Sequence, residues 1–314
     1  MKDKRVVFMG TPDFSVPILE MLIRETNVIL VVTKEDSASG RGNKIQYSPV
    51  KKLALENGIE VFQPKKIKEN YEYILEMNPD IIITCAYGQI IPKELLFTPK
   101  YKAINVHASL LPKLRGGAPL HRCLINGYDK TGITIMYMDV GMDDGDIITQ
   151  SSIDIDFNDN VGIIHDKLSL LGRDLLLQTL PSIFDGTNNR IKQDINEVTY
   201  APIIKREEEH IDFNKNVIDV YNLIRGLYPF PVAYCKLNDD IIKVCEAKIG
   251  NTNIKGEIGQ IGQIVNIYND GIGIKCLDGE LIITKIKPAG KREMSIKDYL
   301  NGKDKLSLLG EILC

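Results

Sequence analysis

The apolar residues in the first part of the chain gather in short runs, separated by stretches with helical spacing. The runs at 5–9, 28–32, 81–84 and 103–107 are apolar almost throughout, which is typical of parallel strands buried on both faces. Between them, apolar residues recur every three or four positions, as in the helix that we expect over 16–23. This alternation of strands and helices predicts a doubly wound α/β sheet.

The pattern changes in the last third of the chain. Residues 197–212 form a mixed polar segment, which we interpret as a linker. A helix is expected over 217–227, and from residue 233 onward short apolar runs alternate with turn signals, as in a small antiparallel barrel. We therefore predict an α/β domain over 1–196 and a β-barrel domain over 213–314.

Composition narrows the class of protein. The chain has 314 residues, of which 44% are hydrophobic and 26% charged, and a net charge of −3. These values exclude wholesale disorder and a generally basic nucleic-acid coat, but not a local basic patch. The six cysteines form no C-x-x-C pair, and no apolar run reaches the roughly 18 residues that a membrane helix needs. We expect a soluble, cytoplasmic, metal-free monomer with free thiols.

A polar pair stands at the end of one predicted strand. Asn105 and His107 are two residues apart, so their side chains point to the same face, at the strand end where α/β proteins bind ligands. An amide can donate to a forming oxyanion, and an imidazole can move a proton. One carboxylate of the acidic loop 139–146 is expected to pair with the imidazole. The alternatives are a structural histidine and an ordinary acidic turn.

Two basic segments are candidates for phosphate contacts. The first is a polar, glycine-containing loop over 34–48, and the second spans 285–292. Each can bind nucleic acid or simply be solvated. Gly10-Thr11-Pro12 is either a tight turn or a ligand contact, and the absence of G-x-G-x-x-G argues against a dinucleotide-dependent dehydrogenase.

Several motifs together resemble the 10-formyltetrahydrofolate-dependent formyltransferases. They are Asn105-x-His107, Ser109-Leu110-Leu111-Pro112, Arg115-Gly116-Gly117-Ala118-Pro119 and Asp143. The resemblance implies that Asn105, His107 and Asp143 are catalytic. It also implies a Rossmann-like catalytic domain followed by a domain similar to an oligonucleotide-binding (OB) barrel.

Other motifs resemble the branch of this family that acts on initiator methionyl-tRNA. They include Phe8-Met9-Gly10-Thr11-Pro12, Gly40-Arg41-Gly42-Asn43-Lys44 and Pro288-Ala289-Gly290-Lys291. The resemblance implies that 10-formyltetrahydrofolate donates its formyl group to the amine of methionyl-tRNA. Together with the two basic segments, it gives the expected tRNA contacts Arg41, Lys44, Lys287, Lys291 and Arg292.

The same resemblance implies a folate pocket formed by loops that follow the strands. Its expected residues are Tyr87, Gly88, Gln89, Ile90, Ser109, Leu110, Leu111, Pro112, Val140 and Gly141. No metal is expected, and no serine or cysteine nucleophile pairs convincingly with His107.

Three other functions remain open. A formyltransferase acting on a sugar-nucleotide amine or on glycinamide ribonucleotide would share Asn105, His107 and Asp143. A non-catalytic RNA-binding module would keep the barrel and make His107 structural. An NAD-dependent dehydrogenase is nearly excluded by the missing glycine fingerprint.

Overall fold

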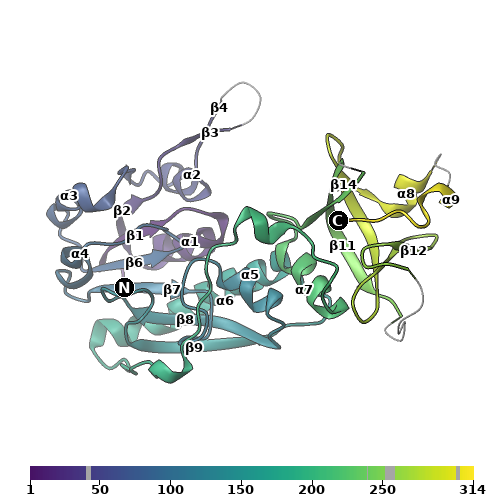
Figure 1. Ribbon diagram of the computed structural model, residues 1–314. Coiled ribbons are helices and arrows are strands. Elements are labelled where there is room, and N and C mark those ends of the chain that lie inside the picture. Colours follow the sequence, from purple (N-terminus) through teal and green to yellow (C-terminus); the bar gives the residue numbers. More distant parts are fainter. Residues whose placement is uncertain (40–43, 239, 252–258, 302–304) are drawn as a thin grey trace. The chain divides into compact units, whose positions relative to one another are not determined.

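The computed structural model describes residues 1–39, 44–238, 240–251, 259–301 and 305–314 (Figure 1). The chain forms two compact units. The first contains Met1–Pro119, Lys130–Asp154 and His165–Pro202, and the second contains Leu120–Asp129, Ile155–Ile164 and Ile203–Cys314. The domain limits expected from the sequence stay a prediction. Each unit has its own hydrophobic core.

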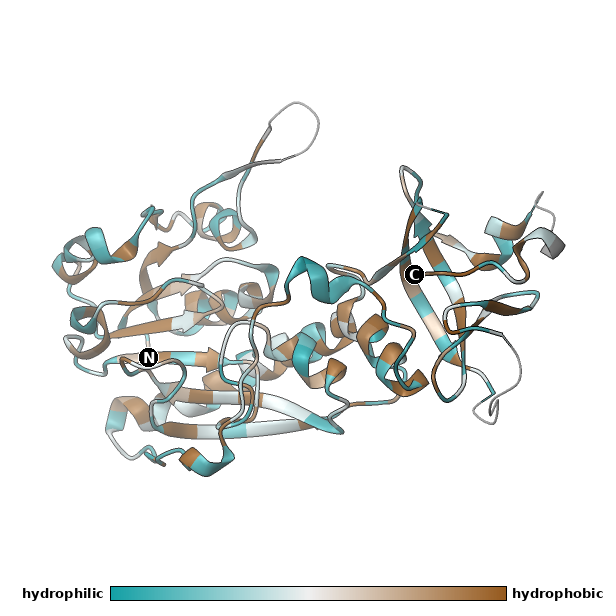
Figure 2. Ribbon diagram, viewed as in Figure 1, coloured by the Kyte–Doolittle hydropathy of each residue, from teal (hydrophilic) through white to brown (hydrophobic). Residues whose placement is uncertain are grey.

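The first unit is built on a seven-stranded sheet with the order β5-β2-β1-β6-β7-β8-β9. Its strands are β1 (Arg5–Gly10), β2 (Asn27–Val32), β5 (Val61–Phe62), β6 (Ile81–Cys85), β7 (Ala103–His107), β8 (Lys130–Tyr137) and β9 (Ile147–Asp154). The five strands from β5 to β7 are parallel, whereas β8 and β9 add antiparallel pairs. Figure 2 shows the central strands as largely hydrophobic. The largely parallel sheet confirms the predicted α/β fold class.

Helices cover both faces of this sheet. They include α1 (Val16–Glu25), α2 (Pro49–Glu56), α3 (Glu72–Glu76), α4 (Lys93–Phe97) and α6 (Val161–Asp185). On one face, α6 packs so closely that a Cβ atom on Gly172 would lie 3.1 Å from Cγ1 of Val106 and 3.5 Å from Cδ1 of Ile18. On the other face, Ile74 of α3 and Leu95 of α4 share a core with strand residues.

The alternation along β7 places the two candidate residues on one face. Ala103, Asn105 and His107 point to the face of α3 and α4, while Ile104 and Val106 point to the opposite face. The strand order reverses between β1 and β6, and open α/β sheets bind ligands at the carboxyl ends of strands near such a reversal. The candidate residues therefore stand at the favoured end, one strand away from the reversal.

The polar loop expected over 34–48 contains a short hairpin. The strands β3 (Ser37–Ser39) and β4 (Lys44–Gln46) pair antiparallel to each other. The sequence pattern did not reveal them, because a two-stranded ribbon needs only backbone hydrogen bonds and no alternation of apolar side chains.

The second unit contains a curled antiparallel sheet with the order β10-β11-β14-β13-β12, and β15 pairs with β14. Its strands are β10 (Tyr234–Leu237), β11 (Asp240–Ile249), β12 (Ile264–Ile267), β13 (Ile272–Lys275), β14 (Glu280–Pro288) and β15 (Met294–Ser295). Its helices include α5 (Pro119–Ile125, which begins in the first unit), α7 (Val217–Leu227), α8 (Ile296–Leu300) and α9 (Lys305–Leu308). The small antiparallel sheet agrees with the prediction.

Residues 311–314 pair with both edges of this sheet. Along β10, the Lys236 amide donates to the Cys314 carbonyl oxygen at 2.6 Å. Along β12, the Ile264 amide donates to the Glu311 carbonyl oxygen at 2.8 Å. The segment thus covers two edge strands that would otherwise expose unpaired backbone groups. The interior is packed, with a cavity of about 20 Å³ between Tyr299 and aliphatic side chains that include Leu313.

No helix in the described part of the chain is long and apolar enough to cross a membrane.

The closure of the barrel predicts the effect of two neighbouring substitutions. Leu313 is 6% exposed, whereas Ile312 is 44% exposed. Leu313→Ala should lower the free energy of unfolding by about 2–5 kcal/mol, because it leaves a cavity in the core. Ile312→Ala should change it by at most about 0.5 kcal/mol. Urea unfolding of both variants checks this, and equal losses would contradict the closure.

Candidate active site

The site is built around the last residues of β7. Asn105 pairs in register with Thr84 of β6 and with Met136 of β8, and His107 pairs with Thr134 of β8. His107 is 6% exposed, so its ring is nearly buried. The neighbouring strands therefore determine which polar atoms face these two side chains.

Thr84 fixes the orientation of the Asn105 amide. Its hydroxyl donates to Oδ1 of Asn105 at 2.8 Å. The amide nitrogen Nδ2 is then the group left to donate, and it forms no hydrogen bond within the described residues. Sequence analysis missed Thr84, although a threonine after three isoleucines was a visible polar interruption near the end of a buried strand.

The two nitrogens of His107 face different partners. Nε2 lies 3.1 Å from the carbonyl oxygen of Leu114. Because a carbonyl oxygen only accepts, Nε2 carries a hydrogen. Nδ1 is therefore the nitrogen that gains or loses the exchangeable proton. It lies 3.7 Å from Oδ2 of Asp143, so the carboxylate faces any positive charge that develops on the ring.

Asp143 reaches the histidine from the loop between β8 and β9. Its backbone has φ of 48°, and its Oδ2 accepts a hydrogen bond from the amide of Gly116 at 2.8 Å. Gly116 has φ of +119°, and a Cβ atom there would lie 2.9 Å from the carbonyl oxygen of Ala201. Only glycine fits this position. The structure thus brings the three expected catalytic residues together.

Thr134 and Gln150 hold the loop that follows β7. The Thr134 hydroxyl donates to the Ser109 carbonyl at 2.6 Å and accepts from the Leu111 amide at 3.1 Å. Nε2 of Gln150 donates to the Leu111 carbonyl at 2.8 Å. The Ser109 hydroxyl donates to the Lys113 carbonyl, and the side chain of Leu111 is buried. Of the four expected folate residues here, only Leu110 and Pro112 are partly exposed.

The loop after β6 contains the other expected folate residues. Tyr87 is 3% exposed, and burial raises the pKa of its phenol to about 12. Its hydroxyl is therefore a donor, yet it has no partner among the described residues. The Gln89 side chain is engaged, since its Oε1 accepts from the Ile67 amide at 2.9 Å. Gly88 has φ of +80°, next to Nζ of Lys34.

Exposed apolar side chains flank the site. Ile90 is 90% exposed, and Val140 and Met142 are 57% and 64% exposed. Gly141 stands between the last two, where a Cβ atom would collide with the carboxylate of Asp144. Such exposed apolar side chains suit contact with a flat heterocycle.

The expected tRNA contacts fall into two groups. Arg41 and the side chain of Lys44 lie outside the described residues. Lys287, Lys291 and Arg292 are exposed in the second unit and, in the part that the structure describes, form no ion pair. Their neighbour Lys285, by contrast, is held by Glu246 at 3.0 Å and Glu293 at 2.7 Å.

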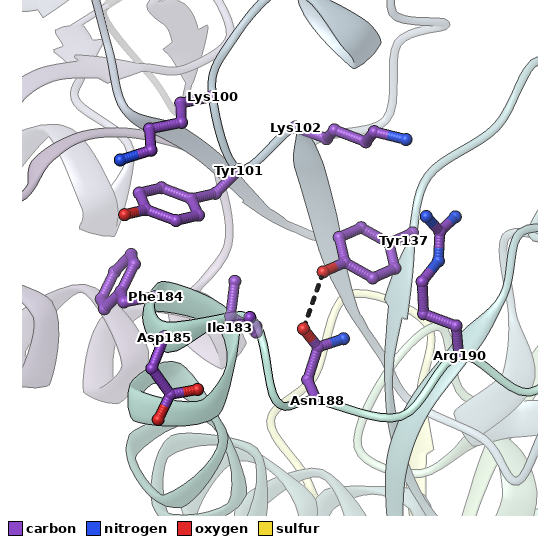
Figure 3. Close-up of a pocket in the computed structure, with 10 residues that line it drawn as sticks. Lys100, Tyr101, Lys102, Tyr137, Ile183, Phe184, Asp185, Asn188 and Arg190 are labelled. Carbon is purple, nitrogen blue, oxygen red and sulfur yellow. Dashed lines mark hydrogen bonds between the residues drawn. The ribbon is translucent and has the colours of Figure 1, made fainter.

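A surface pocket of about 370 Å³ lies elsewhere in the first unit (Figure 3). Lys100 to Lys102 line it directly before β7, at the opposite end of that strand from His107. On its other side, Arg190 lies over the ring of Tyr137 at 4.6 Å. The described residues contain no group of three or more acidic, histidine or cysteine side chains able to hold a metal ion.

The end of β7 presents an amide and an imidazole, and a carboxylate from the loop between β8 and β9 faces the imidazole. Acyl transfer is one reaction that such groups can assist. The family comparison identifies the class. A formyl transferase model matches residues 4–180, and a formyl transferase C-terminal domain model matches residues 203–304. The chain belongs to the formyl transferase family.

Comparison with individual proteins gives a more specific similarity than the family models do. The chain is 48% identical over 312 residues to methionyl-tRNA formyltransferase of Staphylococcus epidermidis strain RP62A, covering 98% of this chain and 99% of the relative.

Two solved structures share the fold. An N-formyltransferase from Helicobacter canadensis, in complex with folinic acid and dTDP-3-aminofucose, matches with a TM-score of 0.66 at 22% identity, over 90% of this chain and 98% of that one. Methionyl-tRNA formyltransferase from Clostridium thermocellum matches with a TM-score of 0.55 at 18% identity, over 79% and 94%. At these identities the likeness shows the fold alone.

Two buried threonines test the role of the hydroxyl that orients Asn105. Thr84→Val removes the donor to the Asn105 amide and should lower formyl-transfer kcat about tenfold, the equivalent of one hydrogen bond. Thr131→Val is the matched control, because that buried hydroxyl has no partner among the described residues. It should leave kcat unchanged and stability equal or higher. Steady-state kinetics decide, and full activity of Thr84→Val would contradict the assignment.

Proposed function

We propose that this protein transfers the formyl group of 10-formyltetrahydrofolate to the α-amine of initiator methionyl-tRNA, giving formylmethionyl-tRNA for translation initiation. The observation that carries the proposal is the 48% identity over nearly the whole chain to a relative named methionyl-tRNA formyltransferase. A cytoplasmic monomer is part of the same proposal. The geometry of the first unit supports the formyl-transfer reaction, since Asn105 and His107 share one face of β7 and Asp143 faces the histidine.

Asn105 stabilises the negative charge that forms on the formyl oxygen. When the amine attacks the formyl carbon, the carbonyl becomes tetrahedral and its oxygen gains charge. Because Thr84 holds Oδ1 of Asn105, the Nδ2 group is oriented before the reaction begins. A donor that is already in place needs no reorganisation as charge develops, which is the main source of such stabilisation.

His107 moves the proton. The attacking amine must lose a proton and the departing folate nitrogen must gain one. Nδ1 of His107 is suited to both steps, since Nε2 keeps its hydrogen on the Leu114 carbonyl. Asp143 faces Nδ1 at 3.7 Å and so lies beside the nitrogen that carries the transferred proton.

The folate binds against the loops around Tyr87 and Val140. 10-Formyltetrahydrofolate supplies the activated formyl group, and the exposed apolar side chains of Ile90, Val140 and Met142 offer it surface to cover. The folinic acid bound by the Helicobacter canadensis N-formyltransferase is consistent with a folate donor.

The second unit binds tRNA through a row of residues across three strands. Tyr234 of β10 pairs with Lys243 of β11, which pairs with Lys287 of β14. Directly paired residues point to the same face of a sheet, so an aromatic ring and two lysines lie in one line. Arg206 stacks over the ring of Tyr234 at 4.3 Å, and its guanidinium is paired with the Glu209 carboxylate. Aromatic rings and cations together suit an RNA strand.

A direct assay tests the reaction. Asn105→Ala should lower kcat for formyl transfer to charged initiator tRNA by about 10²–10³-fold, the typical loss of one oxyanion donor, and His107→Ala should also be severely impaired. Asn57→Ala, which alters an exposed amide at the end of α2, is the control. Formyl transfer to an amino-sugar nucleotide but not to tRNA would show that methionyl-tRNA is not the acceptor. No folate chemistry with any amine would leave the RNA-binding alternative.

The dependence of tRNA affinity on salt tests the second unit. Lys287→Ala and Lys291→Ala should each reduce the slope of log Kd against log salt by about one, because each removes one phosphate contact. Lys248→Ala serves as the control, since this lysine is paired with Asp270 at 3.0 Å near the other end of β11. Filter binding at several salt concentrations measures the slopes, and unchanged slopes for Lys287 and Lys291 would place the tRNA elsewhere.

A further inference from the structure

The segment over 190–201 runs along both loops of the candidate site. Ile191 forms a bridge with Ile147, at the end of the loop that carries Asp143. Tyr200 forms a bridge with Arg115, beside the glycine that binds Asp143. We propose that Gln193, between these two bridges, is a positioning residue that holds Asp143 against His107.

Gln193 joins the two loops with one amide group. Its Nε2 donates to the carbonyl oxygens of Asp143 at 2.8 Å and Gly145 at 2.9 Å. Its Oε1 accepts from Nε of Arg115 at 3.0 Å and from Nη2 at 2.8 Å. Gly116, the next residue after this arginine, donates its amide to the Asp143 carboxylate. The donor and the acceptor of that hydrogen bond therefore belong to loops that Gln193 ties together.

The loop needs such a tie because its own side chains provide little packing. Val140 and Met142 are more than half exposed, and Asp143 has a positive φ. Segments with few buried contacts open at low free-energy cost. Beyond the loop, Arg190 binds the Asp146 carboxylate at 2.9 Å and lies over Tyr137 (Figure 3). That contact fixes the end of the loop, whereas the backbone of Asp143 itself is held by Gln193 and its carboxylate by the Gly116 amide.

Only an amide of this length satisfies both sides. Glutamate keeps the size and the contact with Arg115, but it places acceptor oxygens against two backbone carbonyls. Gln193→Glu should therefore release the loop while the contact with Arg115 is kept and becomes an ion pair. Gln193→Ala removes every contact, and Asp194→Asn is the matched control. The Asp194 side chain accepts from the Asn196 amide at 2.9 Å and does not hydrogen-bond to the loop.

The inference rests on the proposed function for its kinetic test. With 10-formyltetrahydrofolate and methionyl-tRNA, Gln193→Glu should lower kcat about 10- to 100-fold, the scale of a misplacement of about 1 Å, while KM changes less than about twofold. Combined with Asp143→Ala, Gln193→Ala should cause no further loss, because it acts through that carboxylate. A wild-type kcat, or an equal loss in the Asp143→Ala background, would overturn the proposal.

A second measurement does not depend on the reaction. Hydrogen–deuterium exchange of unliganded protein should be faster over residues 139–146 in Gln193→Glu and unchanged in Asp194→Asn, with equal melting temperatures. Faster exchange in Gln193→Glu, combined with no formyl transfer to tRNA by the native protein, would contradict the proposed function but support the positioning role. Unchanged exchange in Gln193→Glu would overturn the positioning role whatever the activity.

Discussion

The site depends on one contact between two loops, the hydrogen bond from the Gly116 amide to the carboxylate of Asp143. The bond requires a positive φ at both residues and a glycine where a Cβ atom would meet the Ala201 carbonyl. It sets the carboxylate facing Nδ1 of His107. Without it, the imidazole would keep its place on β7 but lose the carboxylate that faces its Nδ1.

The rest of the first unit holds the partners of this contact in fixed positions. β7 is paired on both sides, so Asn105 and His107 are held by a sheet rather than by a loop. Thr84 and the Leu114 carbonyl then fix which atom of each side chain faces outward. The strand β7 holds the amide of Asn105 and the imidazole of His107 in fixed positions. The loop between β8 and β9 brings the carboxylate of Asp143, which is distant in the sequence, to the histidine.

Those features of the fold and the site that depend on residues close together in the sequence could be predicted from it. Period-two alternation placed Asn105 and His107 on one face, and apolar runs identified the central strands. Thr84 is visible as a polar interruption at the end of an apolar run. Its role and that of Gln193 could not be assigned in this way, because they depend on hydrogen bonds to residues 21 and more positions away. The sequence also does not reveal that residues 311–314 close the barrel. These residues bind distant strands through backbone groups, which every residue carries.

The most direct test asks whether Asp143 acts through His107. We would measure single-turnover formyl transfer to methionyl-tRNA by His107→Ala, Asp143→Asn and the double variant. If the carboxylate works through the imidazole, the double variant should be about as slow as the slower single variant, because residues that act together are not additive. Losses that multiply would contradict the account and show that the two side chains act independently.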